Sequence, residues 1–118
     1  MLYTRHKTLT DNTEQSILTI PSGHVAHVKY IFVANHGNST NQVDLFWETG
    51  GVPDVYIFDG TSIGAGNKEI LGDSGSGVVF VLSEDETLKA QASSGTGSVE
   101  VVVTIALLPQ PPVLVNFV

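Results

Sequence analysis

Apolar and polar residues alternate with a period of two through most of this chain, and this alternation restricts the fold more than any other feature. In the clearest example, Leu88, Ala90 and Ala92 fall on one face of a predicted strand. The polar residues between them, Lys89 and Gln91, fall on the other face. Successive side chains of a β-strand point to opposite faces, and helical spacing is nearly absent here. An all-β fold is therefore expected.

About eight short strands are expected, with turn signals about ten residues apart. The predicted strands span residues 15–20, 24–36, 42–49, 55–58, 63–71, 78–82, 87–92 and 98–108, after an extended polar lead-in at 2–10. Turn residues such as Pro21-Ser22-Gly23 separate them, because proline sets φ and glycine permits positive φ. This pattern is typical of an antiparallel β-sandwich or jelly roll. We expect one such domain over residues 1–108.

The second faces of several strands are partly apolar and form the first candidate interaction surface. In the strand at 24–36, the even-numbered residues are expected to face the core: Ala26, Val28, Tyr30, Phe32 and Ala34. The candidate interface residues on the opposite faces are Val25, Ile31, Val33, Phe46, Val102, Ala106 and Leu108. Apolar area buried against a neighbour contributes about 25 cal/mol per Å² before the costs of association.

Residues 109–118 form the second candidate, an extended C-terminal arm. Its prolines are expected to stop the preceding strand, because proline fixes φ and lacks the N–H that a ladder needs. The residues that would form the arm are Pro109, Pro111, Pro112, Val113, Leu114, Val115, Phe117 and Val118. Such a segment can add a strand to a neighbouring copy. The alternative is a last strand that folds back on its own sheet.

Three aromatic residues form the third candidate, a sugar-binding platform. Trp47 lies on one predicted strand, and Tyr56 and Phe58 lie on the next. A role in the core or in an interface competes with this interpretation and is favoured, because buried interfaces also select aromatic side chains.

Composition excludes several classes of function. Charged residues are 14% of the 118-residue chain, and 5 basic against 12 acidic residues give a formal net charge of −7. Nucleic-acid binding rests mainly on Lys and Arg, so no nucleic-acid partner is expected.

No apolar run reaches the roughly 18 residues of a membrane span, and the first residues lack the apolar run of a signal peptide. We therefore expect neither membrane insertion nor secretion. The chain contains no cysteine, so disulfides and thiolate metal sites are excluded.

No set of residues indicates an enzyme or a cofactor. Gly72-Asp73-Ser74-Gly75 looks like a serine-protease nucleophile loop, but the chain is too short for that fold and lacks the partners that it requires. His24 and His27 are three residues apart on one predicted strand and should point to opposite faces. The acidic turn at 83–86 offers oxygen ligands without the spacing of a calcium loop, so a solvated turn is favoured.

The order of the segments resembles the small all-β virion proteins of tailed bacteriophages. The resemblance covers residues 15–108 and includes I-P-S-G-H-V-A-H-V-K-Y-I-F-V-A-N at 20–35 and L-S-E-D-E-T-L-K-A-Q-A-S at 82–93, followed by S-G-T-G and the strand S-V-E-V-V-V-T-I. It implies a non-enzymatic structural protein of the virion, assembled in the host cytoplasm and forming homo-oligomers.

Within that class, the leading prediction is a capsid decoration or cement protein that binds neighbouring subunits. Other virion proteins, of the capsid or the tail, would be its partners. A collar, tail or fibre-associated protein is the close alternative. A carbohydrate- or receptor-binding module is the alternative outside the class.

Overall fold

The computed structural model describes residues 2–10, 12–49, 52–72, 77–93 and 98–110. Its strands are β1 (Leu2–Leu9), β2 (Gln15–Thr19), β3 (His24–Asn35), β4 (Asn41–Thr49), β5 (Val52–Ile63), β6 (Lys68–Gly72), β7 (Phe80–Leu82), β8 (Thr87–Ala92) and β9 (Val99–Pro109). The all-β prediction is confirmed. Within the described ranges, no helix has the length and apolar character needed to cross a membrane.

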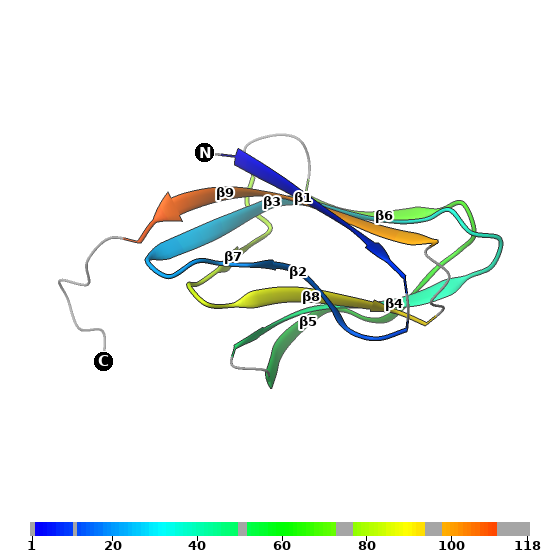
Figure 1. Ribbon diagram of the computed structural model, residues 1–118. Helices are drawn as coiled ribbons and strands as arrows, with labels where there is room; N and C mark the ends of the chain where they lie inside the picture. Colours follow the sequence, from blue (N-terminus) through cyan, green and yellow to red (C-terminus); the bar gives the residue numbers. More distant parts are fainter. Residues whose placement is uncertain (1, 11, 50–51, 73–76, 94–97, 111–118) are drawn as a thin grey trace.

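The strands form two antiparallel sheets packed as a sandwich (Figure 1). Sheet A has the order β1-β9-β3-β6, with β7 also paired to β3, and sheet B has the order β2-β8-β4-β5. The pairs β1–β9, β2–β8, β3–β6 and β4–β5 join strands from opposite ends of the chain toward its middle. This is the strand order of a jelly roll, so the predicted fold class is confirmed.

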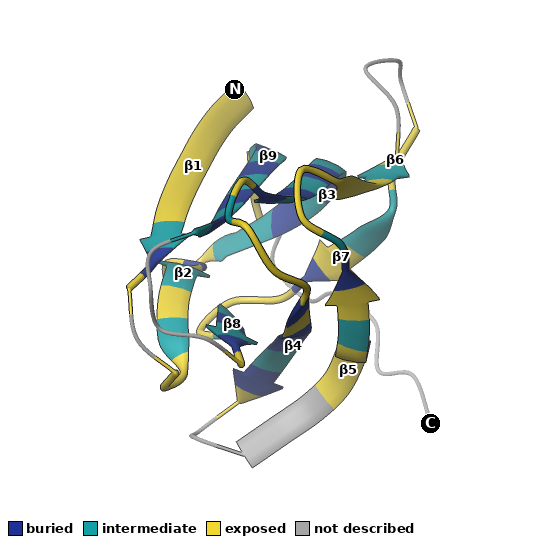
Figure 2. Cartoon of the chain, turned by 90° about the vertical axis from the view of Figure 1, so that its right-hand side faces the viewer, coloured by how far each residue is buried: buried dark blue, intermediate teal, exposed yellow. Residues whose placement is uncertain are grey.

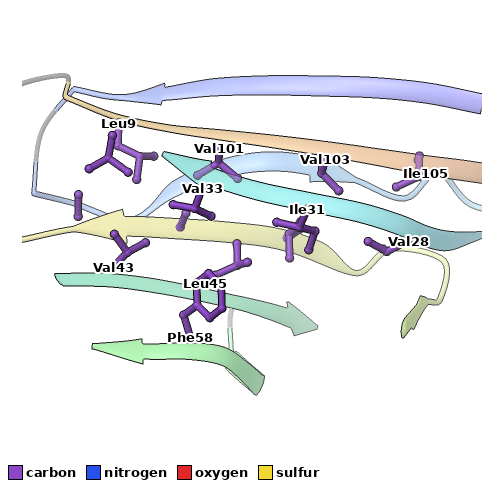
Figure 3. Close-up of a cluster of buried hydrophobic side chains, with 14 of the residues drawn as sticks. Leu9, Val28, Ile31, Val33, Val43, Leu45, Phe58, Val101, Val103 and Ile105 are labelled. Atoms are coloured by element: carbon purple, nitrogen blue, oxygen red, sulfur yellow. The ribbon is translucent and has the colours of Figure 1, made fainter. Parts of the chain in front are cut away.

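The core lies between the two sheets and is filled mainly by aliphatic side chains (Figure 3). Sheet A contributes Val28, Ile31, Val33, Val101, Val103 and Ile105, and sheet B contributes Val43, Leu45, Phe58 and Leu88. All of these residues are at most 8% exposed. Complete burial of such a side chain contributes about 1.5–3 kcal/mol. The odd-numbered residues of β9 face the core, with Leu107 partly buried at its end, so Val102, Ala106 and Leu108 lie on the opposite face as expected.

The inward face predicted for β3 is correct only for its first half. Ala26 and Val28 are buried, but a register shift between Val28 and Tyr30 makes Lys29 the extra residue of a bulge. After the bulge the alternation is inverted, since side chains of a strand alternate strictly between its faces. Tyr30, Phe32 and Ala34 consequently lie on the outer face, and the intervening residues enter the core.

The segment predicted as a strand at 78–82 is only partly buried. Val78 and Val81 are 45% and 47% exposed, while Leu82 alone in this segment is fully buried. β7 lies at the edge of sheet A, where a strand has one neighbour and little cover. Phe80 and Leu82 are the inward residues of β7, and Phe80 stacks on Trp47, whereas Val78 and Val81 lie exposed at the edge.

β9 continues one residue beyond the predicted end of the domain. Pro109 lies opposite His24 of β3, and the Gln110 N–H donates a hydrogen bond of 2.8 Å to the Gly23 carbonyl. The first proline of the predicted arm thus belongs to the strand. It is tolerated because, among the described residues, β1 pairs with β9 only as far as Ala106, so at Pro109 the strand has a single neighbour and behaves as an edge. Residues 111–118, which hold the rest of the arm, lie outside the described residues.

Candidate interaction surfaces

The outer face of sheet A carries an apolar surface, which we call the apolar face. Strand register places the following apolar residues on it: Leu2, Val25, Tyr30, Phe32, Ile70, Val81, Val102, Ala106 and Leu108. The polar residues Thr4, His6, His27 and Thr104 lie between them on the same face. Four of them are large and well exposed, namely Leu2 at 66%, Val81 at 47%, Ile70 at 44% and Leu108 at 36%. The face extends over all five strands of the sheet.

A row across the middle of the sheet shows how the strands build this face. Phe32 of β3 lies opposite Val102 of β9 on one side and Ile70 of β6 on the other. Directly opposite residues of antiparallel strands point to the same side, so these three side chains are neighbours. The Lys68 Nζ lies 5.8 Å from the centre of the Phe32 ring, which places one cation at the border of the apolar row.

The predicted interface residues fall into two groups. Val25, Val102, Ala106 and Leu108 belong to the apolar face. Ile31 and Val33 are wrongly placed by the prediction, because the β3 bulge turns both side chains into the core, where they are 0% exposed.

Phe46, the seventh predicted interface residue, lies on the outer face of sheet B and is covered there. Its ring stacks on Tyr56 with centroids 5.0 Å apart, and only 1% of the residue is exposed. Lys89 lies opposite Phe46, and its Nζ is 2.7 Å from the Glu48 carboxylate. Glu48 is 6% exposed, so the carboxylate of this ion pair is largely shielded from water. Phe46 therefore offers no surface to a partner.

The structure does not bring the three candidate platform aromatics together. Trp47 packs against the core and stacks on Phe80 at 4.8 Å, whereas Tyr56 is 46% exposed on the other side of sheet B. Phe58 is 8% exposed and belongs to the core. A flat platform needs neighbouring rings with exposed faces, so these residues do not form one.

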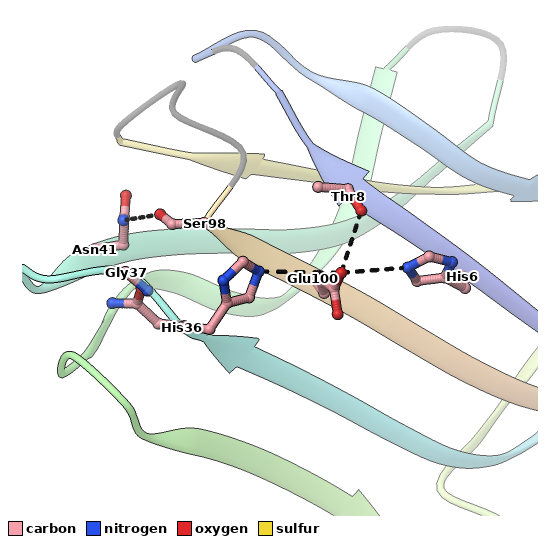
Figure 4. Close-up of polar contacts among 8 residues, drawn as sticks. His6, Thr8, His36, Gly37, Asn41, Ser98 and Glu100 are labelled. Atoms are coloured by element: carbon pink, nitrogen blue, oxygen red, sulfur yellow. Dashed lines mark hydrogen bonds and ion pairs between the residues drawn. The ribbon is translucent and has the colours of Figure 1, made fainter.

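A polar cluster lies on the outer face of sheet A (Figure 4), where its His6 is directly opposite Val102 of the apolar face. The Glu100 carboxylate lies 3.7 Å from His6 Nε2 and 4.0 Å from His36 Nε2, and it accepts a hydrogen bond of 3.4 Å from the Thr8 hydroxyl. Both imidazoles are 58% exposed. In the ranges that the structure describes, no three His, Asp or Glu side chains gather in the manner of a metal site.

The acidic turn joins two loops through hydrogen bonds. Glu84 Oε2 accepts one from the Gly23 N–H at 2.6 Å, and Asp85 Oδ1 accepts one from the Ser22 hydroxyl at 2.9 Å. Glu86 Oε1 accepts the N–H of Ser83 at 2.6 Å. These carboxylates therefore fasten the turn before β8 to the turn before β3. In the Gly72–Gly75 loop considered above, residues 73–76 lie outside the described residues.

Replacing Glu86 by alanine should lower the free energy of unfolding by about 1 kcal/mol, because the half-buried carboxylate caps the Ser83 N–H. Urea denaturation would measure the change. Glu14→Ala, at an exposed position before β2, is the matched control and should change stability by less than about 0.5 kcal/mol. Equal effects in the two variants would contradict a specific role for Glu86.

Two hollows were not foreseen from the sequence. A groove of about 330 Å³ lies between β1 and β2 and is lined by Tyr3, Arg5, Leu18, Thr19, Ile20, Pro21, Ile105 and Leu107. A polar hollow of about 210 Å³ lies against sheet B and is lined by Asn12, Gln42, Asp44, Gly60, Gln91, Ala92 and Ser93. Both join residues far apart in sequence, so only the sheet topology reveals them.

No protein-family model, curated protein or solved structure matches this chain.

Proposed function

We propose that this chain is a non-enzymatic structural protein of a tailed-phage virion, and specifically a capsid decoration protein that contacts neighbouring subunits. The observation that carries the proposal is the apolar face of sheet A. Monomeric proteins rarely expose large contiguous apolar patches, and such patches commonly mark contact sites. The jelly roll supports the proposal by analogy, because the fold recurs in viral capsid proteins.

Charge and surface chemistry support the same assignment. The formal net charge of −7 suits a position on the outside of a particle, away from packaged DNA. The apolar face carries few charges, with Lys68 and Glu100 at one end of it. Depletion of charge at the centre of a surface is typical of interfaces between proteins. A collar, tail or fibre position would use the same chemistry and differs only in the partner.

Replacing Ile70 by aspartate should weaken binding to capsids at least about tenfold, because burial of an isoleucine side chain contributes about 1.5–3 kcal/mol. Ile70 is 44% exposed, so the fold should tolerate the change. The matched control is Val55→Asp, which alters a residue 42% exposed on β5, the edge strand of sheet B. Co-sedimentation of the purified protein with phage particles that lack it measures both variants.

Immunogold labelling of complete particles identifies the location. Label on the head supports the decoration assignment, and label on the collar, tail or fibres replaces it with the alternative. Absence of the protein from purified particles would overturn the virion assignment as a whole. Equal binding by the Ile70 and Val55 variants would overturn the role of the apolar face.

Carbohydrate binding is the second candidate, and the polar hollow on sheet B favours it. Amide and carboxylate groups of Gln42, Asp44 and Gln91 converge there, which suits sugar hydroxyls. Two of these groups already have partners, since Asp44 accepts the Gly60 N–H at 2.7 Å and Gln91 donates to the Asn12 carbonyl at 2.5 Å. A glycan array with the folded protein separates the two functions, because a decoration protein gives no binding.

A further inference from the structure

We propose that the groove between β1 and β2 binds residues 113–118 of a second copy of this chain. The inference deepens the proposed function and rests on it, because a protein that acts in many copies needs contacts between those copies. One such contact would join the groove of one copy to residues 113–118 of another.

The groove has the chemistry of a site for an apolar strand. Leu18 and Leu107 are half-buried in it, and Ile20 and Ile105 form its floor at 1% and 5% exposed. Tyr3, 37% exposed, forms part of one wall. A volume of about 330 Å³ admits a few side chains and excludes a folded domain. A short, mainly apolar segment would fit this groove, which Arg5 and Thr19 also line.

The groove also lies between two open sheet edges. β1 is the first strand of sheet A and β2 the first strand of sheet B, and in the described chain no further strand pairs beyond either one. β1 is exposed along most of its length (Figure 2). An extended segment laid into the groove can hydrogen-bond to such an edge and place alternate side chains inside. Pairing also covers an edge that would otherwise favour aggregation.

Residues 113–118 match this site in composition and length. Five of the six are apolar, with the sequence V-L-V-N-F-V. Extended, six residues span about 20 Å, which is comparable to an ordinary strand. The described chain leads to the same region, because the Gln110 N–H bonds to Gly23, two residues after the groove residue Pro21.

The prolines favour a second copy over the chain's own groove. The groove lies back along β9, beside Ile105 and Leu107, so the arm would have to reverse direction soon after Pro109. Pro111 and Pro112 follow directly, and each proline biases the residue before it toward extended conformations. The two consecutive prolines therefore disfavour the tight reversal that docking in the chain's own groove requires, and this favours a neighbour's groove.

Engineered disulfides test the proposal in the full-length chain, which contains no cysteine of its own. One cysteine replaces Thr19, an exposed groove residue, and a second replaces Phe117. Under mild oxidation, the T19C/F117C variant should form disulfide-linked dimers and longer chains on a non-reducing gel. The control S62C/F117C, with its first cysteine on an exposed residue of β5, should remain monomeric.

Two results would overturn the inference. An internal disulfide in T19C/F117C, at monomer mass with no free thiol, would place the arm in its own groove. Free thiols in both variants would exclude the groove as the site of the arm. Capsid binding is measured separately. Disulfide-linked chains that do not bind capsids would support the groove contact and overturn the proposed function. Capsid binding by variants whose thiols stay free would overturn the groove contact and leave the proposed function in place.

Discussion

Replacing Lys89 by methionine should lower the free energy of unfolding by about 3 kcal/mol, because it leaves the Glu48 carboxylate buried without a counter-charge. The Lys89 Nζ lies 2.7 Å from Glu48 Oε1, and the two side chains are 23% and 7% exposed. Methionine keeps the apolar stem that lies beside Phe46, so the change removes the charge and little of the packing. Urea denaturation at neutral pH measures the loss.

The double variant Glu48→Gln/Lys89→Met separates the charge from the packing. With no charge left to bury, it should recover stability to within about 1 kcal/mol of the natural chain. A loss below about 1 kcal/mol in Lys89→Met alone would show that the pair behaves like a solvent-exposed ion pair. That outcome would contradict the interpretation that the Glu48 carboxylate is buried away from water on the outer face of sheet B.

Replacing Gly72 by alanine should lower the free energy of unfolding by about 3 kcal/mol, for two reasons that act together. Its φ of 79° lies in the left-handed region, which side chains with a Cβ rarely adopt. A Cβ at this position would also stand 2.4 Å from the Lys29 carbonyl oxygen and 2.8 Å from Val79 Cγ2. The first obstacle is backbone at the β3 bulge, which cannot move aside cheaply.

Gly66 provides the matched control for that substitution. Its φ is 76°, but nothing lies within 4 Å of the position that a Cβ would take. Gly66→Ala should therefore cost only the conformational strain, about 1–2 kcal/mol. Thermal unfolding of both variants measures the difference. Equal losses would show that the close approach of β6 to the bulge contributes nothing.

The alternation predicted the sandwich because each strand must bury one face, and it placed β8 and β9 correctly. It failed on β3, because a bulge inverts the alternation at one residue and leaves no local signature. Lys29, a polar residue between apolar ones, fitted the predicted outer face equally well without a bulge. Its role becomes visible only when β6 and β9 are paired to β3.

The candidate surfaces also include one that the local sequence pattern could predict and one that it could not. The outward position of Val102, Ala106 and Leu108 was predictable from the pattern, since β9 is regular and its two faces differ clearly. The groove could not be foreseen, because it joins β1, β2 and β9, and the pairing of the first strand with the last is a property of the whole chain. Short-range patterns carry no information on such long-range pairing.

The central position of β9 in sheet A also determines the order in which the molecule can be completed during synthesis. β1 and β3 have no direct contact in the strand order and are joined only when β9 enters between them. The ribosome releases β9 after every other strand that the structure describes, so the edges of β1 and β3 that β9 covers stay unpaired until that moment. Long-range pairing of this kind is slow to form and leaves the chain open to aggregation meanwhile. Sheet A therefore closes after translation of β9, and a ribosome stalled before Val99 would hold a chain that cannot finish folding.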